Sequence, residues 1–272
     1  MELWEAAVLG LVQGLTEFLP ISSSGHLVLG EYLLGIDKAT SGNVTFEVFV
    51  HFDTVLSILT VYWRTIREVV SDSFAALFRP AEWRERYGSV EGFHTGVNIL
   101  ITMVPTGIVY LLFKDFLEAQ FGDPKFVSGM LIVTGVLLLL TLLRKKPDGS
   151  INPIKAFFIG VAQAAAMLPG ISRSGSTICT ALYLNTAPEK AANFSFLMLL
   201  PVVLIATVLK SVEMMETGFT TSVPVLLVGA LVAYISGVAA IKLLLGVIRR
   251  GKLQYFAIYC FVVGGLGLWL LP

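Results

Sequence analysis

The chain has 272 residues, of which 56% are hydrophobic and 14% charged, with a formal net charge of zero. Its mean hydropathy is +0.81. Soluble domains contain roughly 25% charged residues, so the composition excludes a water-soluble globule and indicates an integral membrane protein. The balanced charge argues against nucleic acid as a partner, because nucleic-acid binding requires a basic face. The two cysteines, Cys179 and Cys260, stand in apolar runs without the spacing of a metal site or a disulfide framework.

The apolar segments are of two kinds. Residues 3–34 are interrupted by PISSSG at 20–25, and residues 154–185 by PGISRSG at 169–175. Each half of these two segments is shorter than the roughly 20 residues that a transmembrane helix needs. The continuous segments of membrane length are, in chain order, 46–63, 92–113, 125–143, 190–209, 222–247 and 253–271. We expect the linker 64–91, which mixes charged and aromatic residues, to lie at the membrane interface.

Each broken segment is either a re-entrant hairpin or a kinked transmembrane helix. Clusters of Arg and Lys at 64–86, 144–155 and 249–252 mark the cytoplasmic side. If all three clusters lie inside, residues 154–185 must start and finish inside and residues 3–34 must start and finish outside, which favours hairpins. The sequence therefore predicts an all-α polytopic membrane protein with about six full transmembrane helices and two re-entrant broken-helix hairpins.

The two breaks belong to an internal repeat. When the chain is shifted by 150 residues, GLVQ at 10–13 falls on GVAQ at 160–163, and ISSSG at 21–25 falls on ISRSG at 171–175, without a gap. With the topology above, this predicts a single membrane domain (1–272) of inverted repeats, approximately 1–143 and 150–272. Inverted repeats with broken helices place a binding site near the middle of the membrane, where the breaks meet.

The ionisable residues in or beside the breaks are Glu17, His26 and Arg173, and ionisable groups inside a membrane segment indicate function. Arg173 begins a half-helix whose free N–H groups, together with the guanidinium, are suited to phosphate. The alternatives are that Arg173 snorkels to the interface or pairs structurally with Glu17. The serines at 22–24 form a matching donor cluster, although N-capping alone also selects serine.

His26 could act as general base, general acid or nucleophile, or be a satisfied core histidine. Glu17 shares a helix face with Gln13 and could be a base, orient His26 or hold a divalent cation. Weaker candidates are His51, as a supporting residue, and Asp53, which is costly in lipid and must face protein or water.

At these residues the sequence resembles the undecaprenyl-pyrophosphate phosphatase family, the bacitracin-resistance phosphatases. The first motif of that family reads QGLTEFLPISSSGH at 13–26, and the second reads PGISRSGST at 169–177. The hydrophobic profile is similar along essentially the whole chain. Gln13 stands where some members carry Glu, which puts two-carboxylate schemes in doubt.

The resemblance implies removal of the terminal phosphate from a C55-type polyprenyl diphosphate, which recycles the monophosphate carrier for cell-wall polymer synthesis. It further implies a divalent cation, Mg²⁺ or Ca²⁺, with Glu17 as a ligand, a homodimer, and a site in a multi-pass cell-membrane protein that opens to the external face. The implied catalytic residues are Glu17, Ser23, His26 and Arg173, and the implied phosphate-site residues are Gln13, Ser22, Ser24, Gly25, Ser172, Ser174, Gly175 and Thr177.

Two other functions remain open at this point. Discontinuous helices in inverted repeats are also a transporter architecture, so a flippase of a lipid phosphate or a transporter of a small anion would use the same Arg and Ser cradle. A purely structural membrane scaffold would leave Glu17, His26 and Arg173 unexplained. Within the phosphatase interpretation, the nucleophile is Ser23, His26 or water.

Overall fold

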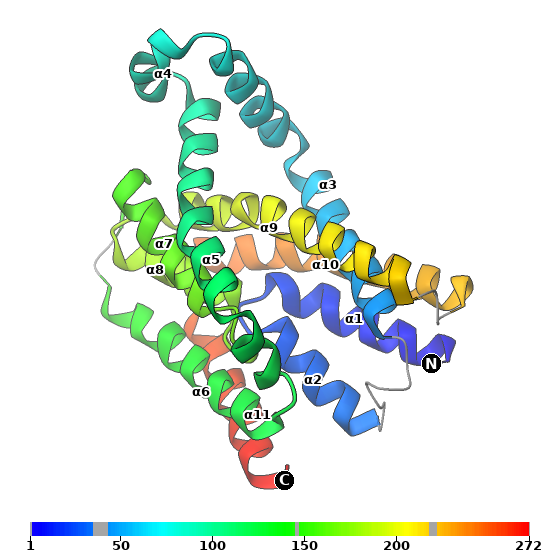
Figure 1. Cartoon of the computed structure of the whole chain (residues 1–272). Helices are drawn as coiled ribbons and strands as arrows, with labels where there is room; N and C mark the ends of the chain where they lie inside the picture. Colours follow the sequence, from blue (N-terminus) through cyan, green and yellow to red (C-terminus); the bar gives the residue numbers. More distant parts are fainter. Residues whose placement is uncertain (1, 35–42, 145–146, 218–221, 272) are drawn as a thin grey trace.

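The computed structural model describes residues 2–34, 43–144, 147–217 and 222–271, without the side chains of 31, 34, 43–51, 210 and 213–217. Over these ranges the fold is all-helical, and the only β-type pairing is a single bridge between Gly149 and Thr186 (Figure 1). The helices are α1 (Leu3–Phe18), α2 (Ser23–Leu34), α3 (Asn43–Leu77), η1 (Pro80–Glu82), α4 (Trp83–Ser89), α5 (Glu91–Gln120), α6 (Pro124–Leu140), η2 (Thr141–Leu143), α7 (Pro153–Ala165), α8 (Arg173–Tyr183), α9 (Pro188–Thr217), α10 (Val223–Arg249) and α11 (Gln254–Leu270).

All six predicted full-length segments are helical, but they are not equivalent. Within the described residues, four helices are long and apolar enough to cross a membrane, namely Glu91–Gln120, Pro124–Leu143, Pro188–Leu209 and Val223–Arg249. The predicted segment 253–271 is the 17-residue helix α11, which falls just below that length. The predicted segment 46–63 lies within α3, which continues to Leu77.

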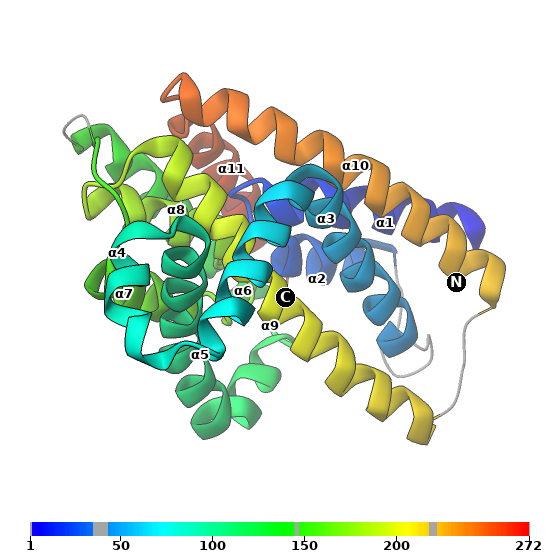
Figure 2. The ribbon, with the colours of Figure 1, turned by 90° about the horizontal axis from the view of Figure 1, so that it is seen from above.

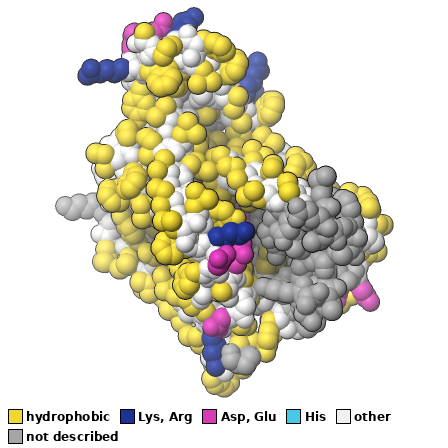
Figure 3. Space-filling view, in the orientation of Figure 1, with side chains coloured by type: hydrophobic (Ala, Val, Ile, Leu, Met, Phe, Trp, Pro, Cys, Tyr) yellow, Lys and Arg dark blue, Asp and Glu magenta, His cyan; other side chains and the backbone are white. Residues whose placement is uncertain are grey.

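The linker 64–91 is more regular than predicted. Its first part continues α3 beyond a kink at Tyr62, and η1 and α4 then lead the chain back into α5. Figure 1 shows this hairpin projecting from the rest of the molecule, and Figure 3 shows Arg and acidic side chains gathered at its end. The indole N–H of Trp83 donates to the carbonyl of Ala76 at 2.7 Å and closes the turn.

Both predicted helix breaks are confirmed. α1 ends before Pro20, which has no backbone N–H to continue a helix, and α2 begins at Ser23. α7 ends at Ala165, and the chain passes through Gly170 at φ +94°, a left-handed conformation suited to glycine. Each break is a reversal: α1 packs against α2, and α7 packs against α8.

The first helix of each pair packs along a long helix from the other half of the chain: α1 along α10, and α7 along α5. Figure 2 shows α1 beneath the length of α10. Glycines permit this approach, because a Cβ atom on Gly10 would lie 2.3 Å from the carbonyl oxygen of Gly229. At the corresponding position of the other pair, a Cβ on Gly160 would lie 2.6 Å from the carbonyl oxygen of Thr102.

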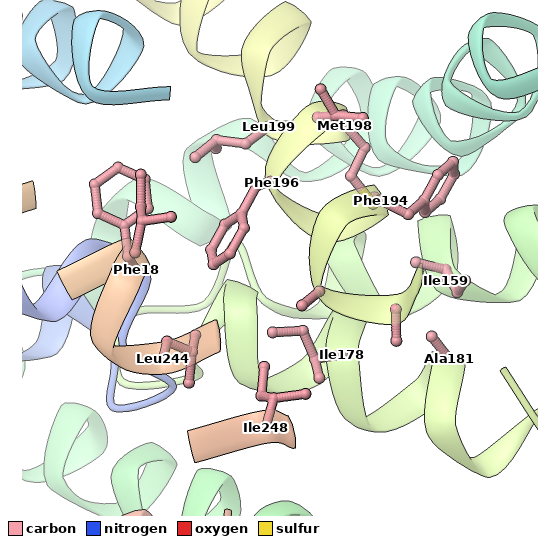
Figure 4. Close-up of a cluster of buried hydrophobic side chains, with 14 of the residues drawn as sticks. Phe18, Ile159, Ile178, Ala181, Phe194, Phe196, Met198, Leu199, Leu244 and Ile248 are labelled. Carbon is pink, nitrogen blue, oxygen red and sulfur yellow. The ribbon is translucent and has the colours of Figure 1, made fainter. Parts of the chain in front are cut away.

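The main hydrophobic core lies where the two breaks meet α9 and α10. Phe18 at the end of α1 packs edge-on against Phe196 of α9, with ring centroids 5.8 Å apart (Figure 4). The outer surface is also apolar: Leu111, Leu143 and Trp269 are each at least 78% exposed, and yellow side chains cover much of the face in Figure 3. Such a surface is suited to lipid.

Candidate active site

A hydrogen-bonded cluster joins the two breaks. Arg173 Nη2 donates to Glu17 Oε1 at 3.1 Å, and the two side chains are only 13% and 11% exposed. The other oxygen of that carboxylate, Oε2, accepts from Ser23 Oγ at 2.5 Å and from Gln13 Nε2 at 3.1 Å. The structure thus brings together four residues predicted from sequence: Gln13, Glu17, Ser23 and Arg173.

The guanidinium of Arg173 is held from the α9 side as well. Nη1 donates to the carbonyl of Ser195 at 3.1 Å, and the hydroxyl of Ser195 is hydrogen-bonded to Thr177 Oγ1 at 2.6 Å. The Nε atom of Arg173 is buried and has no hydrogen-bond partner among the described residues. Because buried donors are almost always paired, this N–H is an exception within the described structure.

The two breaks contact each other in a reciprocal way. A Cβ on Gly25 would lie 3.2 Å from the Cα of Gly170, and a Cβ on Gly175 would lie 3.4 Å from Pro20. Ser174 Oγ donates across the junction to the carbonyl of Leu19 at 3.1 Å. Both predicted glycines therefore lie at the junction, where Gly25 leaves little room for a side chain, and Ser174 joins the two breaks.

A cavity of about 320 Å³ lies against this junction. One part of its wall is polar and contains residues of both breaks, including Glu17, Ser23 and Arg173. The rest is mainly apolar but includes an ion pair of α5, Lys114 with Glu118 at 3.7 Å. The polar break residues are Glu17, Ser22, Ser23, Ser24, Ser172 and Arg173, and the apolar wall includes Leu117, Phe121, Met167, Ile171, Leu199, Val202 and Val203.

His26 does not line this cavity. Its Nδ1 lies 2.7 Å from the carbonyl oxygen of Ser22, and its Nε2 lies 2.7 Å from the hydroxyl of Tyr259 on α11. Both ring nitrogens are thus engaged on the α11 side of α2. Sequence reasoning grouped His26 with Glu17 and Arg173, whereas the described structure gives it no direct contact with either.

Several predicted phosphate-site residues bind protein groups. Ser22 Oγ accepts from the backbone N–H of Gly25 at 3.3 Å, and Ser172 Oγ accepts from that of Gly175 at 3.1 Å. Thr177 Oγ1 donates to the carbonyl of Arg173 at 2.8 Å. These serine hydroxyls cap the second helix of each pair.

Three residues that sequence reasoning did not assign also support the site. Ser195 binds Arg173, Tyr259 binds His26, and Thr134 accepts from the N–H of Ser172 at 2.9 Å while donating to the carbonyl of Gly170. All three are polar residues within apolar helices, which is the signal that could have identified them.

A divalent cation has limited protein ligands here. Among the described residues there is no group of three or more His, Cys, Asp or Glu side chains that could hold a metal. The Oε1 atom of Gln13 is buried without a partner in the described structure, and Gln13 is bonded to Glu17. These two oxygen donors fit a hard cation that takes its remaining ligands from phosphate and water.

Two weaker candidates have different outcomes. The side chain of His51 lies outside the described residues. Asp53 is 5% exposed, and its Oδ2 has no hydrogen-bond partner in the described structure. Asp53 is thus buried within the protein, which satisfies the requirement that it avoid lipid.

Comparison with known proteins places the chain in a family. A family model described as "Bacitracin resistance protein BacA" matches residues 6–266. A protein of Salinibacter ruber named undecaprenyl-diphosphatase is 60% identical over 271 residues, which cover 100% of both chains. Proteins of the same name from Bacteroides fragilis and Syntrophotalea carbinolica are 43% and 41% identical, over 97% and 98% of this chain and 96% and 98% of their own. The chain therefore belongs to the bacitracin resistance protein BacA family.

Proposed function

We propose that the protein is a membrane phosphatase that hydrolyses undecaprenyl diphosphate to the monophosphate and inorganic phosphate. The observation that carries the proposal is the buried cluster of Glu17, Ser23 and Arg173 at a cavity whose remaining wall is largely apolar. A polar end suits the diphosphate and an apolar wall suits the prenyl chain. The names of the relatives favour this activity over transport.

Binding of the terminal phosphate falls to Arg173 and the two helix N-termini. Arg173 lines the cavity, and a guanidinium matches phosphate geometry. α2 and α8 both begin at the junction, so their positive dipole ends point toward the same region. This arrangement stabilises the negative charge of the transferring phosphoryl group.

Ser23 is the proposed nucleophile and Glu17 the base. Their 2.5 Å hydrogen bond lets the carboxylate take the hydroxyl proton as the Ser23 Oγ–phosphorus bond forms and the bond from phosphorus to the bridging oxygen breaks. The lipid monophosphate leaves. Water then attacks the phosphoserine, its oxygen becomes part of the inorganic phosphate, and Glu17 returns the proton to Ser23.

The proposed Mg²⁺ or Ca²⁺ would be held by Glu17 and by Gln13 Oε1, together with oxygens of the substrate. Bound there, it would neutralise phosphate charge.

The prenyl chain is proposed to leave the cavity between α5 and α9. Leu117 of α5 and Leu199 and Val203 of α9 line this apolar wall, and the outer surfaces of both helices carry exposed apolar side chains, such as Leu111 and Val208. A lipid could therefore enter from the bilayer without passing through water.

The proposed membrane arrangement is an inverted repeat of six full spans and two re-entrant hairpins, with the cavity open to the external face. Reciprocal packing supports the repeat, since α1 lies along α10 as α7 lies along α5. The cavity is lined by the second half of α5, residues 106–121. The first half of α5 adjoins the Arg-rich hairpin that marks the cytoplasmic side. A homodimer is proposed from the family resemblance alone.

The test is phosphate release from undecaprenyl diphosphate by the purified protein in detergent. We expect equal amounts of inorganic phosphate and lipid monophosphate, loss of activity in Glu17→Gln, and loss in EDTA that Mg²⁺ or Ca²⁺ restores. Rapid quenching should trap a phosphoenzyme at Ser23. A folded wild-type protein that releases no phosphate with divalent cations present would overturn the proposed function, and release without any phosphoenzyme would favour direct attack by water.

A further inference from the structure

The imidazole of His26 is held from both sides in a way that fixes its tautomer. A carbonyl oxygen can only accept, so the 2.7 Å contact with Ser22 requires a proton on Nδ1. In the neutral ring Nε2 is then an acceptor, and the Tyr259 hydroxyl at 2.7 Å must donate to it. The two rings are also stacked, with centroids 5.5 Å apart and planes within 12°.

This pair acts on an unusual stretch of backbone. Ser22 has φ +71°, in the left-handed region, which is unfavourable for a residue with a Cβ. Its carbonyl accepts from both the ring Nδ1 and the backbone N–H of His26, the latter at 3.2 Å. The residue that follows Ser22 is Ser23, whose hydroxyl donates to Glu17. The conformation at Ser22 therefore determines where Ser23 points.

The second break has no equivalent clamp and does not need one. Ser172 corresponds to Ser22 but has φ −72°, an ordinary conformation. Its carbonyl accepts from the backbone N–H of Ser176 at 2.8 Å, and Ser176 stands where the first repeat has His26. The strained backbone and the clamp thus occur together, in the break that carries Ser23.

Tyr259 supplies the fixed end of this clamp. It lies on α11, which packs against α6, and its neighbour Cys260 has its Sγ 3.9 Å from the carbonyl oxygen of Pro20. α11 is therefore held beside the first break independently of His26.

We infer that Tyr259 is a positioning residue for the phosphatase reaction. By donating to His26 Nε2, it fixes the ring that holds the Ser22 carbonyl and thereby the Ser23 hydroxyl against Glu17. This inference rests on the proposed function, because its catalytic effect is exerted through Ser23.

The kinetic test compares Tyr259→Phe with Tyr255→Phe, a matched change at an exposed tyrosine of the same helix. Loss of the hydrogen bond to His26 should lower kcat about tenfold in Tyr259→Phe, with KM changed less than about twofold, whereas Tyr255→Phe should match wild type. Tyr259→Leu, which also loses the stacking, should be slower than Tyr259→Phe. Wild-type kcat in Tyr259→Phe would overturn the inference.

A double-mutant cycle separates action through His26 from a general effect on α11. In a His26→Ala background, Tyr259→Phe should have no further effect on kcat, because the coupled partner is gone. Multiplication of the two single-variant losses would contradict the inference.

An NMR measurement tests the hydrogen bond independently of activity. In protein labelled with ¹⁵N-histidine, the His26 signals, assigned by their loss in His26→Ala, should show a protonated Nδ1 and a hydrogen-bonded Nε2 acceptor. The Nε2 signal should move toward that of a free acceptor in Tyr259→Phe. An unchanged signal would overturn the inference, whereas a wild-type protein with this NMR signature but no phosphate release would count against the proposed function alone.

Discussion

The two helix breaks share their cap serines and glycines but differ at the positions that carry a charge or a nucleophile. Residues related by a shift of 150 are identical at the caps, Ser22 and Ser172, and at the close-contact glycines, Gly25 and Gly175. In both breaks the serine hydroxyl accepts from the glycine N–H.

At the positions that carry charge or a nucleophile, the two breaks diverge. Glu17 corresponds to Met167, Ser23 to Arg173, and His26 to Ser176. Ser23 and Arg173 occupy the same place in the two copies, and both bind the one carboxylate of Glu17.

The comparison separates the residues that recur in both breaks from the residues that differ between them. The cap serines and the glycines recur because each second helix is capped at its start and the two breaks lie against each other. A symmetric pair of identical groups would give two arginines or two serines. Divergence instead places a base, a hydroxyl and a cation around one point, as phosphoryl transfer requires.

The largest expected effect on kcat comes from removing the positive charge of the second break. Arg173→Ala should lower kcat about 10³-fold, because it removes the guanidinium that neutralises the transferring phosphoryl group, together with the ion pair that this guanidinium makes with Glu17. Arg173→Lys should recover little, since an ammonium lacks the planar fork. Phosphate release is the measurement, with Lys242→Ala, an exposed cation of α10, as control. Activity of Arg173→Ala within tenfold of wild type would contradict the role given to the second break.

The next largest effect on kcat distinguishes Ser23 from its neighbour Ser24 in the first break. Ser23→Ala should lower kcat at least about 10²-fold, because catalysis through a positioned nucleophile is lost, and it should abolish the phosphoenzyme. Ser24→Ala should lower it much less, since Ser24 Oγ is bonded only weakly to Ser22 Oγ, at 3.4 Å. Equal losses of kcat in the two variants would show that these serines act only as hydrogen-bond donors. Ser23 would then not be the nucleophile.

A smaller effect tests whether the two copies are equivalent in packing. Gly10→Ala and Gly160→Ala should each lower stability by roughly 1–3 kcal/mol, the usual cost of overpacking, because each new Cβ would meet backbone at 2.3 Å and 2.6 Å respectively. Thermal unfolding in detergent is the measurement. Gly107→Ala, where no atom lies within 4 Å, should be neutral or slightly stabilising. A large drop in one copy alone would break the equivalence of the α1–α10 and α7–α5 contacts.

The smallest effect concerns the shared caps. Ser22→Ala and Ser172→Ala should each reduce stability by about 1 kcal/mol, the usual value for an N-cap serine. Denaturation by heat checks both. A Ser172 variant as stable as wild type would show that the amide of Gly175 finds another acceptor and that the two caps are not equivalent.

The sequence determined the helical class, the two breaks and the residues around which the site forms. These follow from local causes: long apolar runs are helical in a bilayer, Pro20 and Gly170 lie within the non-helical breaks, and charged groups inside apolar segments are costly unless they are used. The shift of 150 residues indicated that the breaks belong together.

Only the tertiary structure decided which of these side chains meet. Glu17 and Arg173 are 156 residues apart and become a pair because the two breaks cross. His26 stands three residues after Ser23, a spacing that by itself places two residues on one helix face, and yet His26 bonds Tyr259 of α11 whereas Ser23 bonds Glu17 of α1. Local sequence fixes where a helix can break, whereas the packing of distant helices fixes the direction in which each side chain at the break points.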